Sequence, residues 1–261
     1  MDFTPLPQKT PPQNPATRPP LTPELLQTLA SKVAAVEDCL RRVVREHAPV
    51  AFANSLGAED MALTDMILKN ALPIRIFTLD TGRLHPETCD LLADAERHYG
   101  RRFEVFYPEH TTLERFVHTY GINAFYASVA ARRQCCHIRK VEPLRRALAG
   151  CKAWITGMRA QQSATRQGLA VQEFDAGHGL EKFNPLADWS EKEVWAYIRS
   201  NDVPYNPLHD QFYPSIGCAP CTRALATGED IRAGRWWWEN PETKECGLHA
   251  REKQGEGHQR L

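Results

Sequence analysis

The stretch PVAFANSLGAED, residues 49–60, decides the fold class of this chain. Residues 49–54 form a short apolar run that predicts a buried strand, and residues 55–60 predict a turn before a helix over 61–69. Gly57 lets the chain turn tightly, so that successive N–H groups and the helix N-terminus face one point where an oxyanion can bind. Ser55 can add a hydroxyl donor. The alternative is a plain strand-to-helix turn in which Ser55 or Asp60 acts as a cap.

Strand and helix patterns alternate on both sides of this stretch. Strands separated by helices of about 10–15 residues imply crossover connections, and therefore an α/β fold with a mostly parallel sheet flanked by helices. Ligands bind beyond the carboxyl ends of the strands in such sheets, so the loops that follow the strands should hold any site. The predicted strands are 49–54, 74–79, 103–107 and 153–156, and the predicted helices are 23–47, 61–69, 86–99, 133–148 and 190–199.

Two further loops at predicted strand ends carry cations. The loop DTGRLH, residues 80–85, contains Arg83 and the titratable His85, and the loop over 156–166 contains Arg159 and Arg166. Guanidinium forks match the oxygens of sulfate and phosphate. A single arginine in a loop is usually just solvated, but three anion-friendly loops at three strand ends favour a binding site.

The composition sets broad limits on the class of protein. Lys and Arg total 32 and Asp and Glu total 32, so the net charge is zero and no overall attraction to nucleic acid or to an anionic membrane is expected. No apolar run approaches the roughly 20 residues of a membrane span, and the N-terminus lacks a secretion signal. We therefore expect a cytoplasmic protein with no nucleic-acid or membrane partner, and a homo-oligomer remains an open alternative.

The ends of the chain differ in texture from its middle. Residues 1–23 hold eight of the nineteen prolines and predict a disordered leader. Residues 24–235 should form the α/β domain, and residues 236–261 a mobile C-terminal tail.

Eight cysteines in a reducing compartment are seldom structural disulfides. Two close pairs stand out, and four thiols in two pairs suit a tetrahedral thiolate site. Adjacent cysteines leave little slack to reach a single zinc ion, whereas the separate iron corners of a [4Fe–4S] cluster suit them. A redox dithiol, a structural zinc site and an accidental pair are the alternatives. The pairs are Cys135–Cys136 and Cys218–Cys221, and the cysteines interpreted as small buried hydrophobes are Cys39, Cys89 and Cys151.

Two residues near these pairs and the C-terminus are further candidates. Lys140 lies about one helical turn beyond Cys136, where its ammonium could approach a cluster; the alternative is a solvated helix face. Cys246 stands alone in ECGLH, residues 245–249, in a polar setting. Nearby cations such as protonated His249 would favour its thiolate, which makes it a candidate nucleophile. The alternative is an incidental exposed thiol.

Taken together, SLGAED, LDTGRLHPET, the CC and CxxC pairs and ECGLH resemble the thioredoxin-dependent sulfonucleotide reductases, over about residues 45–249. The resemblance implies a fold like that of the adenine-nucleotide α-hydrolases, with a C-terminal tail. The matching positions are Ser55, Gly57, Glu59 and Asp60 for the nucleotide loop; Asp80, Thr81, Gly82 and Arg83 for a second substrate loop; Arg159 and Arg166 for later basic residues; Arg232 and Arg235 for phosphosulfate contacts; Cys135, Cys136, Cys218 and Cys221 for cluster ligands; Lys140 facing the cluster; Cys246 for the nucleophile; and His249 in the tail.

The same resemblance implies an activity. The cluster cysteines mark the branch that reduces adenosine 5'-phosphosulfate (APS) to sulfite and AMP, with a sulfonate carried on Cys246 and removed by thioredoxin or a glutaredoxin-like donor. One alternative is an enzyme acting on 3'-phosphoadenosine 5'-phosphosulfate (PAPS). Others are an ATP pyrophosphatase that transfers sulfur, for example to tRNA, and a cluster-bearing redox sensor.

Overall fold

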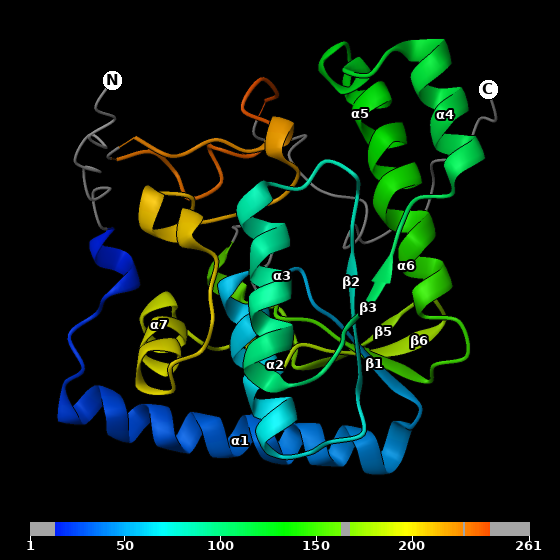
Figure 1. The fold of residues 1–261 in the computed structure, drawn as a ribbon. Helices are drawn as coiled ribbons and strands as arrows, with labels where there is room; N and C mark the ends of the chain where they lie inside the picture. Colours follow the sequence, from blue (N-terminus) through cyan, green and yellow to red (C-terminus); the bar gives the residue numbers. More distant parts are fainter. Residues whose placement is uncertain (1–13, 163–167, 227, 241–261) are drawn as a thin grey trace, which may run out of the picture.

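A six-stranded sheet forms the centre of the molecule, in a computed structural model that describes residues 14–162, 168–226 and 228–240 (Figure 1). The strand order is β3-β2-β1-β4-β6-β5, and every neighbouring pair is parallel except β5 with β6. This arrangement confirms the predicted mostly parallel α/β fold. The strands are β1 Val50–Ala53, β2 Arg75–Leu79, β3 Glu104–Phe106, β4 Ala153–Ile155, β5 Gln172–Asp175 and β6 Leu180–Phe183.

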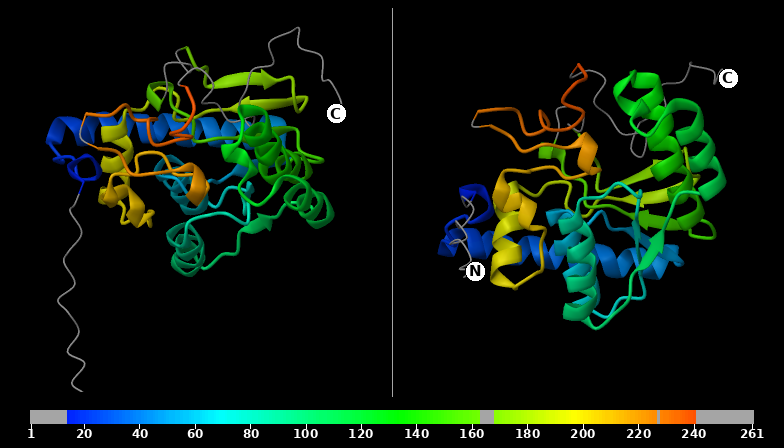
Figure 2. Two further views of the ribbon diagram at one scale, coloured as in Figure 1. Left: turned by 90° about the horizontal axis from the view of Figure 1, so that it is seen from above. Right: turned by 45° about the horizontal axis from the view of Figure 1, so that its top comes forward.

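Helices cover both faces of this sheet. Val50 and Phe52 of β1 point into a large core shared with α1, α2, α3 and α7, while Ala51 points to the opposite face, where it packs with α6. The right-hand view of Figure 2 shows the strands between α1 (blue) and the green helices. The helices are α1 Pro23–His47, α2 Ala58–Lys69, α3 Pro86–Tyr99, α4 His110–Tyr120, α5 Val129–Cys136, α6 Glu142–Ala147 and α7 Glu191–Ser200.

Local sequence signals explain several of the helix ends. The Thr22 side chain caps α1 by accepting from the Leu25 N–H, and Pro23 occupies the first turn. Ser190 and Glu193 form a reciprocal capping box at the start of α7. One predicted helix differs: the span 133–148 is interrupted by a π-helical turn at His137–Val141, which separates α5 from α6.

The predicted disordered leader is corrected for residues 14–23. Pro15–Thr17 forms a short 3-10 helix, and buried Thr17 donates from Oγ1 to Asp210 Oδ1 at 2.5 Å. Arg199 Nε donates to the Thr17 carbonyl oxygen at 2.9 Å. These polar contacts hold the segment against the folded domain despite its prolines. Residues 1–13 lie outside the described part of the chain.

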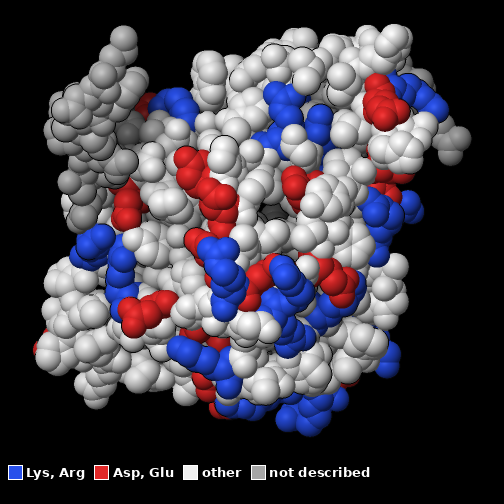
Figure 3. Space-filling view, viewed as in Figure 1, with Lys and Arg blue, Asp and Glu red and all other residues white. Residues whose placement is uncertain are grey.

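The C-terminal boundary also differs from the expected tail of 236–261. Trp236 is only 1 % exposed and packs among cysteines, so the ordered domain extends at least to Asn240. Residues 241–261 lie outside the described ranges. None of the described helices is long and apolar enough to cross a membrane. Acidic and basic side chains are interspersed on the face shown in Figure 3.

Candidate active site

A cavity of about 260 Å³ lies at the carboxyl ends of the central strands. Its walls include the loops after β1 and β4, which are neighbours in the sheet although β2 and β3 separate them in sequence. The order of strands reverses at this point, and ligands of open α/β sheets bind at such a position. Predicted site residues that line the cavity are Ser55, Gly57, Glu59, Asp60, Thr81, Lys140, Arg159, Arg232 and Arg235.

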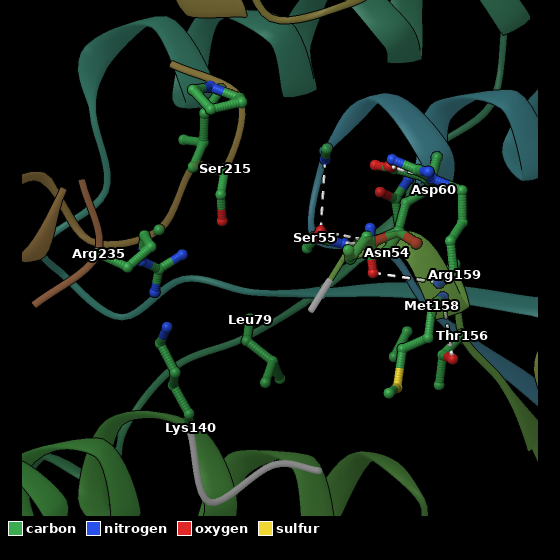
Figure 4. Close-up of a pocket in the computed structure, with 18 of the residues that line it drawn as sticks. Asn54, Ser55, Asp60, Leu79, Lys140, Thr156, Met158, Arg159, Ser215 and Arg235 are labelled. Atoms are coloured by element: carbon green, nitrogen blue, oxygen red, sulfur yellow. Dashed lines mark hydrogen bonds and ion pairs between the residues drawn. The ribbon is translucent and has the colours of Figure 1, made fainter. Parts of the chain in front are cut away.

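The loop after β1 is held in shape by its own side chains. Asp60 Oδ2 accepts hydrogen bonds from the Ser55 N–H at 2.7 Å and from Ser55 Oγ at 2.5 Å (Figure 4). Leu56 adopts a left-handed conformation (φ 62°), and its N–H donates to Asn54 Oδ1 at 2.6 Å. Gly57 is the N-cap of α2 and has no side chain to cap it, so the first turn of α2 begins at the cavity wall with its amide groups available for an anion.

Asp60 connects this loop to the loop after β4. The Gly157 N–H also donates to its carboxylate, and a Cβ atom at Gly157 would lie 2.1 Å from Asp60 Oδ1, so only glycine fits there. The pKa of Asp60 is raised to about 6. Burial is the main cause and neighbouring Glu59 adds to it, while the Ser55 and Gly157 hydrogen bonds act in the opposite direction. The strand-end loops therefore share one buried carboxyl group.

Glu59 forms a second link between the same loops. Its Oε1 lies 2.7 Å from Nε of Arg159, whose side chain is buried. Burial favours a higher pKa for Glu59, but the Arg159 guanidinium, together with a backbone hydrogen bond and His209, lowers the pKa overall. The Arg159 charge is thus engaged by a carboxylate inside the cavity wall.

Only part of the second predicted substrate loop reaches the cavity. Thr81 lines it, and its Oγ1 lies 3.2 Å from Cys218 Sγ. Asp80 Oδ1 accepts from the Gly82 N–H at 2.8 Å and so shapes the turn. Arg83 points elsewhere, because its guanidinium donates to the Ile122 carbonyl oxygen at 2.9 Å and to Asn123 Oδ1 at 3.0 Å.

Cationic side chains line the side of the cavity nearest the C-terminal segment. Lys140 from the π-helical turn and Arg235 point toward the same space in Figure 4, and Arg232 also lines the cavity. The Arg235 guanidinium lies 4.7 Å from the centre of the Trp236 ring, and its Nε has no hydrogen-bond partner among the described residues. These charges face a space of suitable size for an anion.

The four paired cysteines come together beside these cations. Cys136, Cys218 and Cys221 are buried in one cluster with Phe125 and Trp236, and Cys135 packs against it. Burial raises the pKa of the Cys221 thiol to about 12, and Cys218 acts in the same direction, while Lys140 and Arg235 act in the opposite direction. The same two cations therefore lie close to both the cavity and the thiols.

Four thiols are the donor set that a metal group at this place would use. No set of three or more His, Cys, Asp or Glu side chains in the described ranges converges on a point where one metal ion could bind. A single zinc ion holds its thiolates at about 2.3 Å, which brings the sulfurs within about 4 Å of one another. A polynuclear cluster has separate iron corners and accepts a wider spacing. The donor set here is three buried thiols and the half-buried thiol of Cys135, with Lys140 and Arg235 beside them.

Three predicted site residues cannot be placed. Arg166, Cys246 and His249 lie outside the described residues. One residue that the sequence analysis missed is His209, which is buried in the cavity wall near Glu59. Burial lowers its pKa. Nothing in its local sequence signals a position in the cavity, because it follows a turn-rich segment far from the strand ends.

Comparisons with known proteins agree with this geometry. Residues 49–224 match the family model of the phosphoadenosine phosphosulfate reductase domain. The chain belongs to this family. It is 62 % identical over 225 residues to an adenosine 5'-phosphosulfate reductase from Allochromatium vinosum, covering 86 % of this chain and 88 % of the relative. It is 54 % identical over 234 residues to a protein of the same name from Burkholderia cepacia, covering 90 % of this chain and 92 % of the relative.

Solved structures support the family fold. A PAPS reductase from Candida auris, crystallised with phosphate, superposes with a TM-score of 0.64 at 29 % identity, covering 78 % of this chain and 98 % of that one. Yeast FAD synthetase superposes with a TM-score of 0.55 at 11 % identity, covering 80 % of this chain and 71 % of that one. The latter similarity concerns the fold alone.

Proposed function

We propose that this protein reduces APS to sulfite and AMP in sulfate assimilation. The observation that carries the proposal is a cavity at the switch point of the sheet that joins an amide-rich nucleotide loop to a cationic wall beside four cysteines. The relatives from A. vinosum and B. cepacia, both named adenosine 5'-phosphosulfate reductase, align over most of the chain and support the same substrate.

Charge compensation is the physical requirement of the reaction. The phosphosulfate group of APS is a dianion, and an attacking thiolate is also negative, so the site must neutralise charge before the two can approach. Lys140, Arg232 and Arg235 supply positive charge from the cavity wall. The amides at the start of α2, beyond Gly57, bind the nucleotide side of the anion.

The proposed reaction proceeds in two steps through a sulfonate on Cys246. The Cys246 thiolate attacks the sulfur of APS, a sulfur–sulfur bond forms, and the sulfur–oxygen bond to AMP breaks, which leaves an S-sulfonate on Cys246. A thiolate of a dithiol reductant attacks Cys246 Sγ and releases sulfite. The second thiol of the reductant then frees Cys246, so the reductant leaves as a disulfide and has supplied two electrons. Thioredoxin or a glutaredoxin-like protein of the cytoplasm has the chemistry for this step.

A [4Fe–4S] cluster would be held by Cys135, Cys136, Cys218 and Cys221. When bound, it would supply a fixed charge that tunes the pocket electrostatically. Lys140 would lie between the cluster and the substrate, because its charge acts on the Cys221 thiol while its side chain lines the cavity. No electron transfer through the cluster is needed for the proposed reaction.

Incubation of anaerobically purified protein with APS, without reductant, tests the proposal. Mass spectrometry should find one sulfonate on Cys246 and AMP in equal amount. Cys246→Ser should abolish both products, while Cys89→Ser, at an exposed free cysteine, is the matched control and should form both. Equal release of AMP by Cys246→Ser and wild type would contradict the mechanism. A faster reaction with PAPS than with APS would contradict the substrate assignment.

A further inference from the structure

A buried ion pair joins the helix of the vicinal cysteines to the last described residues. Arg132 of α5 donates from Nε to Glu239 Oε1 at 2.9 Å and from one terminal nitrogen to Oε2 at 2.8 Å. The Arg132 side chain is 0 % exposed and that of Glu239 is 3 % exposed. The pair is therefore bidentate and almost completely removed from water.

The contacts of this pair reach both pairs of cysteines. Arg132 lies one turn before Cys136 on α5, hydrogen-bonds its side chain, and stacks at 4.7 Å from the centre of the Trp236 ring. The Trp236 N–H donates to the Cys221 carbonyl oxygen at 3.1 Å, and the Glu239 N–H donates to the Trp236 carbonyl oxygen at 2.8 Å. The segment 236–239 is thus attached to α5 on one side and to the CxxC turn on the other.

Packing alone does not account for such a pair. Apolar side chains of similar volume often replace a buried ion pair with no loss of stability, because both charges lose their hydration on burial. The planar fork of Arg132 fixes the distance and the direction of the Glu239 carboxylate in a way that an apolar contact would not. The pair specifies where Glu239 sits relative to the cysteines.

That position matters for the chain that follows. Cys246 is seven residues beyond Glu239, and an extended chain spans at most about 3.6 Å per residue, so the Cα atom of Cys246 stays within about 25 Å of that of Glu239. Trp236, three residues before Glu239, lines the cavity. Moving Glu239 changes which positions lie within chain length of it, so the effective concentration of the Cys246 thiol at the cavity should fall.

We propose that Arg132 and Glu239 are positioning residues that fix the origin of the C-terminal segment against the cysteine cluster, and thereby keep Cys246 within reach of the cavity. This inference rests on the proposed function, because it takes Cys246 as the nucleophile. It assigns no chemical step to Arg132 or Glu239. The cysteines then also have a structural role. One pair contacts Arg132 through Cys136, and the other contacts Trp236 through Cys221, so both pairs help to hold Glu239 in place.

The test distinguishes a role of Arg132 and Glu239 in positioning Cys246 from a role in nucleotide binding or in folding. Glu239→Gln removes the charge and half of the bidentate acceptor, and Arg132→Lys keeps the charge but loses the fork. Each anaerobically purified variant is mixed with APS in a single turnover, and the rate of sulfonate formation on Cys246 is followed by mass spectrometry. AMP affinity and iron content are measured on the same samples. Both variants should sulfonate at least about tenfold more slowly than wild type, with unchanged AMP affinity and unchanged iron.

A matched control lies in the same part of the chain. Arg223 and Glu229 form another bidentate pair, at 2.7 and 2.6 Å, but their side chains are 40 % and 31 % exposed. Glu229→Gln should sulfonate at the wild-type rate. Normal sulfonation by Glu239→Gln and Arg132→Lys would overturn the inference, and so would a parallel loss of AMP binding and iron in both, because the pair would then serve the fold in general. If wild type itself forms no sulfonate, the proposed function fails instead.

Discussion

Substituting Gly157 by alanine tests whether the buried Asp60 carboxyl shapes the nucleotide loop. A Cβ atom at this position would lie 2.1 Å from Asp60 Oδ1, 3.1 Å from Glu59 Cβ and 3.2 Å from Asp60 Cγ. Real Cβ atoms essentially never come within 3.0 Å of another atom, so at least 0.9 Å of movement is required (3.0 − 2.1). Neither neighbour can move cheaply, because Ser55 holds Asp60 and Arg159 holds Glu59.

The cost follows from what must give way. Displacing the Asp60 carboxylate weakens hydrogen bonds from the Ser55 N–H and Oγ, and bonds to charged groups contribute about 1.5–3 kcal/mol each. Part of the strain will relax, as it does in other overpacked sites, where the cost is about 1–3 kcal/mol. We expect Gly157→Ala to lower the free energy of unfolding by about 2–4 kcal/mol and the affinity for AMP at least about tenfold.

Urea denaturation and calorimetric titration with AMP measure these two quantities. Gly177→Ala is the matched control, because Gly177 is exposed in the β5–β6 turn and its Cβ atom would meet Asp175 Oδ1 at an ordinary 3.4 Å. The control should change neither quantity. Wild-type AMP affinity in a folded Gly157→Ala protein would refute the idea that Asp60 couples the loops after β1 and β4 to nucleotide binding.

Three other predictions concern separate parts of the chain. The folded pKa of Asp60 is raised to about 6, above about 3.9 in the unfolded chain, so its contribution to stability is full below about pH 4 and is lost as pH rises through about 6. Asp60→Asn cannot ionise, so urea denaturation should show the stability of wild type falling relative to this variant across that range. Arg235→Ala should weaken APS binding in equilibrium dialysis by about tenfold, whereas Arg83→Ala should leave AMP affinity unchanged, because Arg83 lies outside the cavity lining. Thr17→Ala should lower the free energy of unfolding by about 1–2 kcal/mol in urea denaturation, since it loses the hydrogen bond to Asp210.

The sequence predicted those elements whose pattern reflects burial. The strands β1, β2 and β4 are short apolar runs buried on both faces, and they were located to within one or two residues. The strand β5, Gln172–Asp175, was missed because its only apolar residue, Phe174, is exposed, and because the strand carries two carboxylates. The helix α4, His110–Tyr120, was also missed, since only Phe116 along it is fully buried.

The sequence predicted the part of the candidate site that lies in the loops at the carboxyl ends of the parallel strands. The carboxyl ends of β1 and β4 had to meet at one edge of the sheet, which brought Ser55 and Arg159 into one cavity wall. The partner of each side chain was not predictable. Arg159 is engaged by Glu59, 100 residues away in sequence, and His209 reaches the cavity from a turn-rich segment. Such pairings arise from tertiary packing, which leaves no periodic signal in the sequence.

The loop over 79–85 shows how one motif can serve two structures at once. The Arg83 carbonyl oxygen accepts from the Ala219 N–H at 2.8 Å, inside the CxxC turn, and Thr81 Oγ1 contacts Cys218 Sγ. The Arg83 guanidinium also acts electrostatically on the Cys135 thiol. Two hydrogen-bond contacts and one electrostatic interaction therefore tie this loop to the cysteines. Thr81 is the only polar side chain of the loop that lines the cavity. The loop begins where β2 ends, so its contacts with Cys218 and Ala219 connect the sheet to the cysteines. The cysteines in turn hold the segment 236–239, because the Trp236 N–H donates to the Cys221 carbonyl oxygen. The same loop therefore joins the cavity to the cysteines, and Lys140 and Arg235 lie close to both.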